Sequence, residues 1–186
     1  MTALALTTFR FPENTCIPQA QPKSAVGVTL ASPALDVMTD LALVRAATID
    51  PETSLHKAEQ VMIQQGVRSL FVVSEFPCVE GLVTAADLLG DKPMRLVNQR
   101  KVQRQDLTVN DVMTQLSQLD ALDYNELKGA TVSEVIATFK KVGSATHLLV
   151  VQAATEKGPS RIRGVISITQ IERQLGRAVL ELSPGP

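Results

Sequence analysis

In some stretches of this chain the apolar residues recur at helical spacing among polar ones. In other stretches they form continuous apolar runs. Residues 46–49 form a short apolar segment that ends before a proline, which is typical of a strand. Apolar side chains then recur at helical spacing over 54–65, which predicts a helix that Gly66 ends. The apolar positions of this helix are Leu55, Ala58, Val61 and Met62.

Two apolar runs follow this predicted helix. Residues 69–74 and 81–83 are rich in β-branched and other apolar side chains, so both predict buried strands. Residues 84–90 then predict a short helix. The segment as a whole indicates the order strand, helix, strand, strand, helix.

The same order of predicted helix and strands occurs again later in the chain. Thr131 followed by Glu134 forms a capping-box pattern at the start of a second predicted helix, which Gly143 ends. Residues 147–151 and 164–166 align with the two buried strands of the first copy. The apolar stripe of the second helix consists of Val132, Val135, Ile136 and Phe139.

A tetrapeptide, Asp-Val-Met-Thr, precedes each copy, at 36–39 and at 111–114. The spacing between matching positions widens only where loops are expected, and loops tolerate insertions better than packed elements do. An internal repeat means that one copy alone is expected not to bury its apolar face. We therefore expect function to lie in the cleft between two copies.

Composition narrows the class of protein. The chain has 186 residues, of which 45% are hydrophobic but only 3% aromatic, so the predicted core is aliphatic. A net charge of −1 creates no overall field that would draw the chain to nucleic acid. Cys16 and Cys78 are far apart, and we expect a cytoplasmic protein with free thiols, no secretory signal and no membrane span.

Prolines interrupt the start of the chain, which predicts an extended arm; it either adds an edge strand at 26–30 or is partly disordered. The predicted organisation is an arm at 1–34, a first repeat at 35–91, a basic and helical linker at 92–105, a second repeat at 106–178 and a tail at 179–186.

The repeated unit resembles a tandem of cystathionine β-synthase (CBS) domains, also called a Bateman module. The resemblance rests on the two tetrapeptides, on GLVTAAD at 81–87 and on GVISITQ at 164–170, and it covers residues 35–178. It implies an α/β (α+β) fold in which two β-α-β-β-α repeats pack with pseudo-twofold symmetry. It also implies an adenosine-containing ligand between the repeats, such as AMP, ADP, ATP or S-adenosylmethionine, and a further pairing of modules into a homodimer.

The resemblance assigns ligand contacts to specific residues. Thr84 and Asp87 match a pattern in which a hydroxyl at a helix start meets phosphate and an acid one turn later accepts the ribose hydroxyls. The alternative is that Thr84 is only an N-cap and Asp87 only a first-turn acid. Arg68 is placed to face phosphate, and Thr48 is a weaker candidate near the base or ribose.

The second repeat departs from this pattern. Ser167 keeps the hydroxyl, but Gln170 replaces the acid, and we align Arg68 with Ala145. We therefore expect one competent cleft in the first repeat and a second that is degenerate or empty. His147 could reach a phosphate, but a histidine at a strand start is more often structural.

No pattern for a catalytic nucleophile, phosphate loop or metal site occurs, so we expect a regulatory module with no required cofactor rather than an enzyme. Its partners would be an adenine nucleotide or adenosyl ligand, a second copy and an unknown effector protein. The alternative is a structural scaffold that acts through protein–protein contacts. Nucleic-acid binding through the basic linker at 92–105 is a more distant option.

Overall fold

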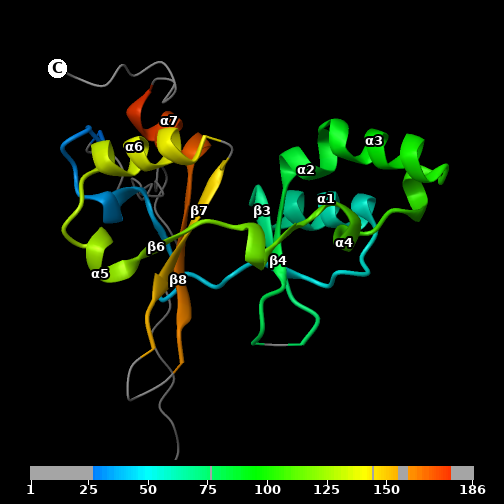
Figure 1. Cartoon of the computed structure of the whole chain (residues 1–186), viewed down its shortest axis with the longest axis horizontal. Coiled ribbons are helices and arrows are strands. Elements are labelled where there is room, and N and C mark those ends of the chain that lie inside the picture. The colour runs from blue at the N-terminus through cyan, green and yellow to red at the C-terminus, as the bar shows by residue number, and fades with distance from the viewer. Residues whose placement is uncertain (1–26, 76, 144, 155–158, 177–186) are drawn as a thin grey trace, which may run out of the picture.

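The computed structural model describes residues 27–75, 77–143, 145–154 and 159–176, which form two halves that lie side by side (Figure 1). Each half contains a four-stranded sheet covered by helices on one face. The two sheets meet through their other faces. This is the predicted α+β class with two repeats packed against each other.

The first half is built from a contiguous part of the chain. Its sheet has the order β2-β3-β4-β5, in which only the β2–β3 pair is parallel. Its elements are β2 (Thr48–Ile49), α1 (Leu55–Gln65), β3 (Ser69–Val72), β4 (Gly81–Thr84), α2 (Ala85–Leu89), α3 (Asp91–Arg100), α4 (Val109–Val112) and β5 (Thr114–Gln115), with the 3-10 turns η3 (Arg104–Asp106) and η4 (Leu116–Gln118).

The second half combines two distant segments of the chain. Its sheet has the order β1-β8-β7-β6, so a strand from the start of the described chain lies at its edge. Its elements are η2 (Ala34–Val37), β1 (Thr39–Asp40), β6 (Ala121–Asp123), α5 (Tyr124–Leu127), α6 (Val132–Val142), β7 (His147–Gln152), β8 (Arg161–Ser167) and α7 (Ile168–Leu175).

The two long helices begin and end as predicted. Ser54 caps α1 by accepting a hydrogen bond from the Lys57 N–H, and Gly66 ends it with a φ of 65°. Thr131 and Glu134 form the predicted capping box of α6. Three of the four predicted apolar side chains of α1 and all four of α6 are buried, with Val61 only partly so.

The repeated tetrapeptide and the repeated glycine contact each other across the molecule. Residues 38–39 run close to Gly164, and a Cβ on Gly164 would lie 2.7 Å from the Thr39 carbonyl oxygen. A Cβ on Gly81 would lie 2.4 Å from the Thr114 carbonyl oxygen. The tetrapeptide at 36–39 thus packs on the second repeat, and the one at 111–114 packs on the first.

Each tetrapeptide therefore packs on the repeat that it does not precede in the sequence, and we call this the exchange of the opening segments. As a result, the two structural halves do not coincide with the two sequence repeats. Sheet and core join residues 48–115 in one half, and join residues 34–40 to residues 121–175 in the other. The boundaries at 35–91 and 106–178 describe the repeat in the sequence and stay a prediction. Residues 1–26 and 177–186, which include most of the predicted arm and the tail, lie outside the described residues.

The described end of the arm forms no strand at 27–30. Its backbone nevertheless attaches to the second half, because the Leu30 carbonyl accepts a hydrogen bond from the Ser133 N–H at 2.9 Å. Val28 and Leu30 pack against the core of that half. The expected edge strand is therefore wrong for the described part of the arm.

Alternate positions of the central strands face different cores. In β3, Leu70 and Val72 face the helices of their own half, whereas Phe71 faces the other sheet. In β7, Leu149 takes the same inward position. Because side chains of a strand alternate between two faces, burial on both faces explains the continuous apolar runs. Phe71, Leu82 and Leu149 thus form a third core, which lies between the two sheets and joins the halves.

The register corrects one sequence alignment. The Ala85 N–H donates to the Arg68 carbonyl, and the Ile168 N–H donates to the Thr146 carbonyl. The counterpart of Arg68 is therefore Thr146, and the predicted match to Ala145 is wrong. The second copy has one more residue between the helix and the strand, in a loop where an insertion costs little.

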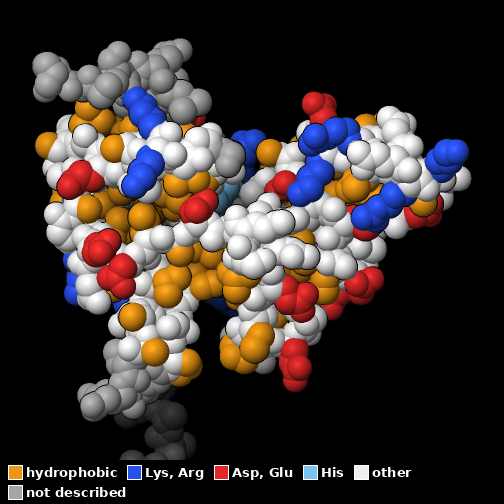
Figure 2. All heavy atoms as spheres, in the orientation of Figure 1, with side chains coloured by type: hydrophobic (Ala, Val, Ile, Leu, Met, Phe, Trp, Pro, Cys, Tyr) orange, Lys and Arg blue, Asp and Glu red, His pale blue; other side chains and the backbone are white. Residues whose placement is uncertain are grey.

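The basic linker contains α3 and uses most of its charges internally. Lys92 donates to the carbonyls of Val112 and Met113, Arg100 pairs with Asp111, and Arg104 donates to the Leu88 carbonyl. The remaining basic side chains give the end of the molecule that carries α3 a visibly basic surface (Figure 2). No helix of the described residues is long and apolar enough to cross a bilayer.

Candidate functional site

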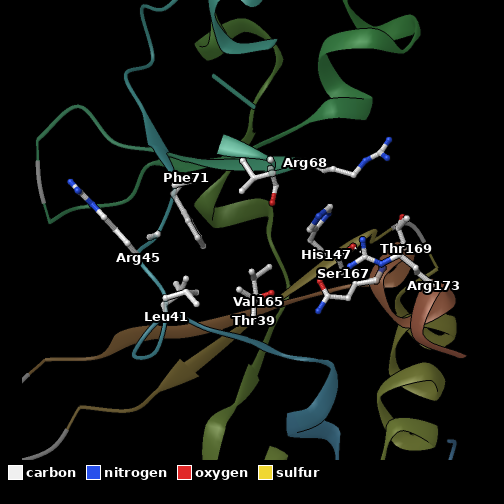
Figure 3. Close-up of a pocket in the computed structure, with 17 residues that line it drawn as sticks. Thr39, Leu41, Arg45, Arg68, Phe71, His147, Val165, Ser167, Thr169 and Arg173 are labelled. Carbon is white, nitrogen blue, oxygen red and sulfur yellow. Dashed lines mark hydrogen bonds between the residues drawn. The ribbon is translucent and has the colours of Figure 1, made fainter. Parts of the chain in front are cut away.

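A cavity of about 380 Å³ opens between the two halves (Figure 3). Its volume lies near the lower end of the range of small-molecule sites, about 300–1,000 Å³. The first half contributes the segment before β2, the turn after α1 and part of β3. The second half contributes β1, the start of β7, the end of β8 and the first turns of α7.

The middle of the cavity is apolar. Phe71 on β3 and Val165 on β8 point into it from opposite sheets, and Leu41 closes it from the turn after β1 (Figure 3). Ala46 and Ala47 complete this wall. Small and flat apolar side chains leave space for a planar group between the two sheets.

One end of the cavity is polar and basic. His147, Ser167 and Thr169 gather there with Arg173, and Arg68 extends over the same end from the first half (Figure 3). Arg45 lies at the other end. None of these three arginines forms an ion pair within the described residues, and the lining contains no carboxylate. The cavity is therefore suited to an anion.

α7 explains how the polar end is built. Ser167 caps this helix by accepting a hydrogen bond from the Gln170 N–H at 3.4 Å. Gln170 and Arg173 are three residues apart and so share one face of the helix. Both line the cavity, and the Gln170 side chain makes no hydrogen bond within the described residues.

His147 lies at the junction of the two halves. Its Nδ1 is 3.0 Å from the Thr146 hydroxyl. Burial lowers the pKa of His147 below 6.5, and the negative charge of Asp87 on the other half partly opposes this. Burial thus disfavours the protonated ring, and the other ring nitrogen has no hydrogen-bond partner among the described residues.

The predicted site residues separate into two groups. The structure brings Arg68 and Ser167 together at the cavity. Thr84 and Asp87 do not line it: they form the capping box of α2, and Thr84 is only 9% exposed. Thr48 lies exposed on β2 outside the cavity.

Sequence reasoning missed several lining residues. Arg173 could have been found, because helical spacing from Gln170 places it on the same face. Arg45 and Phe71 gave no such signal, since one lies in an irregular segment and the other in a continuous apolar run. His147 was interpreted as structural, yet it lines the cavity.

The described residues contain no group of three or more metal-binding side chains. The fold is a pair of α+β repeats that enclose a cavity lined by both of them. Residues 34–91 match the model of the CBS domain family. This match covers the first of the two sequence repeats.

Solved structures share the fold at low sequence identity. An uncharacterized conserved protein from Pyrococcus horikoshii is 20% identical, with a TM-score of 0.53 over 85% of this chain and 100% of that one. The CBS domain of a bacterial CNNM/CorC family Mg²⁺ transporter, solved with an inhibitor, is 16% identical, with a TM-score of 0.52 over 83% and 81%.

An enzyme also contains a similar region. GMP reductase from Trypanosoma brucei is 16% identical, with a TM-score of 0.51 over 78% of this chain but only 28% of the reductase. No curated protein matches the chain. At these identities the similarity establishes the fold alone.

Proposed function

We propose that this chain is a regulatory module that binds an adenosine-containing nucleotide in the cavity between its halves. The observation that carries the proposal is the division of the cavity into an apolar middle and a basic end without carboxylates. A nucleotide has the same division, with a flat base at one end and phosphates at the other.

Each part of the ligand has a matching part of the cavity. The base would lie between Phe71 and Val165, where the surfaces of the two sheets approach each other. The phosphates would lie near Arg68 and Arg173, close to the start of α7. The N-terminal end of that helix carries the positive end of its dipole, which favours an anion beside the arginines.

The sugar would lie between these two ends. Ser167 and Gln170 are placed there, and an amide can both donate to and accept from ribose hydroxyls. Sequence reasoning favoured the cleft with Asp87 over this one. The charge distribution favours the cavity with Gln170 instead.

The cavity suggests how binding could regulate a partner. Arg68 belongs to the first half and Arg173 to the second, so a bound phosphate would bridge them. A ligand that contacts both halves biases their relative packing, and an effector protein or a second copy could respond to that bias. In this proposal the module has no catalytic role of its own.

A thermal-shift screen of AMP, ADP, ATP and S-adenosylmethionine tests the proposal. A ligand at 100-fold above its Kd stabilises the folded state by about 2.7 kcal/mol, which should raise Tm by roughly 5–10 °C. Arg173→Gln should remove most of the shift. Arg95→Gln, which removes an exposed positive charge on α3 outside the cavity, is the matched control and should keep it.

The scaffold alternative is favoured by a different observation. Leu43, Ile63 and Leu89 are large apolar side chains that are 82%, 73% and 62% exposed. If the screen shows no shift with any nucleotide and Ile63→Lys changes the oligomeric state, the scaffold function replaces the sensor function.

A further inference from the structure

Asp87 is the acid that the sequence pattern offers to a ribose, and both of its oxygens already have partners. Oδ2 accepts hydrogen bonds from the Thr84 N–H at 2.9 Å and from the Thr84 hydroxyl at 2.7 Å. Oδ1 lies 3.6 Å from Nζ of Lys92. The acceptor positions that Oδ1 keeps free lie beside the Lys92 ammonium group, so a ribose diol that reaches them would compete with this cation for the carboxylate.

Lys92 is held in place independently of Asp87. Its Nζ donates to the carbonyl of Val112 and, at 3.3 Å, to that of Met113, at the C-terminal end of α4. Carbonyl groups at a helix end attract a cation. The two carbonyls and the carboxylate together match the three donors of an ammonium group. A ligand would therefore not easily move Lys92 away.

The second half has a neutral contact in this region. There the amide of Gln174 on α7 donates to the Asp36 carbonyl of η2 at 3.5 Å. η2 occupies the place that α4 has in the first half. Because Gln174 is neutral, and because Gln170 stands where Asp87 would be, the described residues of this half form no ion pair at the sugar position.

The arginines of the cavity also lack counterparts on the Asp87 side. The strand register matches Arg68 with Thr146 and Arg45 with Gln118. The position of Arg173 corresponds to Gly90, counted from the N-caps Thr84 and Ser167. The symmetry-related position thus offers an acid that is paired with Lys92 and no matching arginine.

We propose that Lys92, by pairing with the Asp87 carboxylate, prevents it from binding a ribose. The nucleotide is thereby confined to the cavity beside Ser167 and Gln170. The chain then binds one ligand rather than the two that its internal symmetry would allow. This inference rests on the proposed function and adds the residue that selects between the two symmetry-related positions.

The test is the number of adenosine molecules bound per chain, measured by isothermal titration calorimetry. Adenosine carries the ribose diol but no phosphate, so the lack of arginines near Asp87 does not exclude it. Wild type should bind one. Lys92→Met keeps much of the apolar stem, removes the ammonium group and should bind two. Lys92→Arg keeps the charge and should stay at one.

A second variant locates the new site. Asp87→Asn added to Lys92→Met should return the number to one, because the freed carboxylate is lost. Circular dichroism melts establish that each variant is folded, and Lys92→Gln replaces Lys92→Met if the latter is not.

The outcomes separate this inference from the proposed function. Two adenosine molecules on wild type, or one on a folded variant without the ammonium group, would overturn the role of Lys92 and leave the cavity assignment intact. A wild-type chain that binds neither adenosine nor ATP would overturn the proposed function, and this inference with it.

Discussion

At the scale of one residue, the position of His147 between the halves makes the stability of the fold depend on pH. Burial lowers its pKa below 6.5, although Asp87 partly opposes this. Below pH 6.5 the unfolded chain therefore binds a proton that the folded chain resists, and folding loses stability as pH falls.

The expected result is a decrease in the free energy of unfolding between pH 7.5 and pH 5.5, measured by urea denaturation. His147→Gln should flatten this dependence. The carboxylates of Asp40 and Asp111 also have lowered pKa values, but their stabilisation is lost only below about pH 4. An unchanged slope in His147→Gln would show that another group titrates.

The ion pair of Asp40 and Arg163 joins the exchanged strand β1 to β8. Two hydrogen bonds, 2.8 Å from Nε and 2.7 Å from Nη2, connect the guanidinium to the carboxylate. Hydrogen bonding from Arg163 lowers the pKa of Asp40, and the same contact raises the pKa of Arg163. Arg163 also lies 4.8 Å from the centre of the Tyr124 ring.

Asp40→Asn should therefore reduce the free energy of unfolding at pH 7 by about 1–3 kcal/mol. The difference from wild type should shrink as pH falls below 4, because protonation removes the same charge from the wild-type chain. Chemical denaturation at pH 7 and pH 3.5 measures both. A difference that does not change with pH would mean that the charge of Asp40 contributes nothing.

At the scale of elements, two glycines allow the exchanged segments to approach the sheets. Gly81→Ala would place a methyl group 2.4 Å from the backbone oxygen of Thr114. The expected cost is about 1–3 kcal/mol, since a backbone atom cannot rotate away as a side chain can. Gly129→Ala is the control, because its nearest neighbour would be 3.8 Å away. Equal urea midpoints for the two variants would contradict this reading.

Periodicity predicted the elements well because their signals are local. Caps such as Ser54 and Thr131 and the stripe of α6 act within one turn of helix, so the sequence beside them suffices. The exchange of the opening segments was not predicted, because the pairing of β1 with β8 joins residues that lie far apart in the chain. No local pattern encodes which repeat a tetrapeptide covers.

The site was harder to predict for the same reason. Arg68 and Ser167 were identified, but the pattern around Thr84 and Asp87 indicates a helix cap as well as a ligand site. Asp87 contacts Thr84 within its own helix cap and also Lys92, and the position of Lys92 depends on where α4 packs. Phe71 lines the cavity because β3 is buried on both faces, which depends on the other half.

At the scale of the whole molecule, the contiguous first half should behave as a folding unit. A fragment of residues 45–118 contains all four strands of its sheet and all of its helical core. A fragment of residues 35–91 follows the sequence repeat but lacks the core side chains of Leu107, Val109 and Val112. We expect a cooperative circular-dichroism melt from the first fragment and none from the second.

The contradicting outcome is a cooperative melt from residues 35–91 alone. It would mean that the exchanged segment is dispensable and that the repeat in the sequence is also the unit of folding. Both fragments expose the third core, including Phe71 and Leu82, so both need low concentration and a sedimentation control.

At the scale of the whole molecule, the proposed function depends on one cavity that the two halves share. A crystal structure of the full chain grown with ATP tests this most directly. We predict density for the base between Phe71 and Val165 and for the phosphates near Arg68 and Arg173. Density beside Asp87, or an empty cavity at a concentration of ATP that shifts Tm, would contradict it.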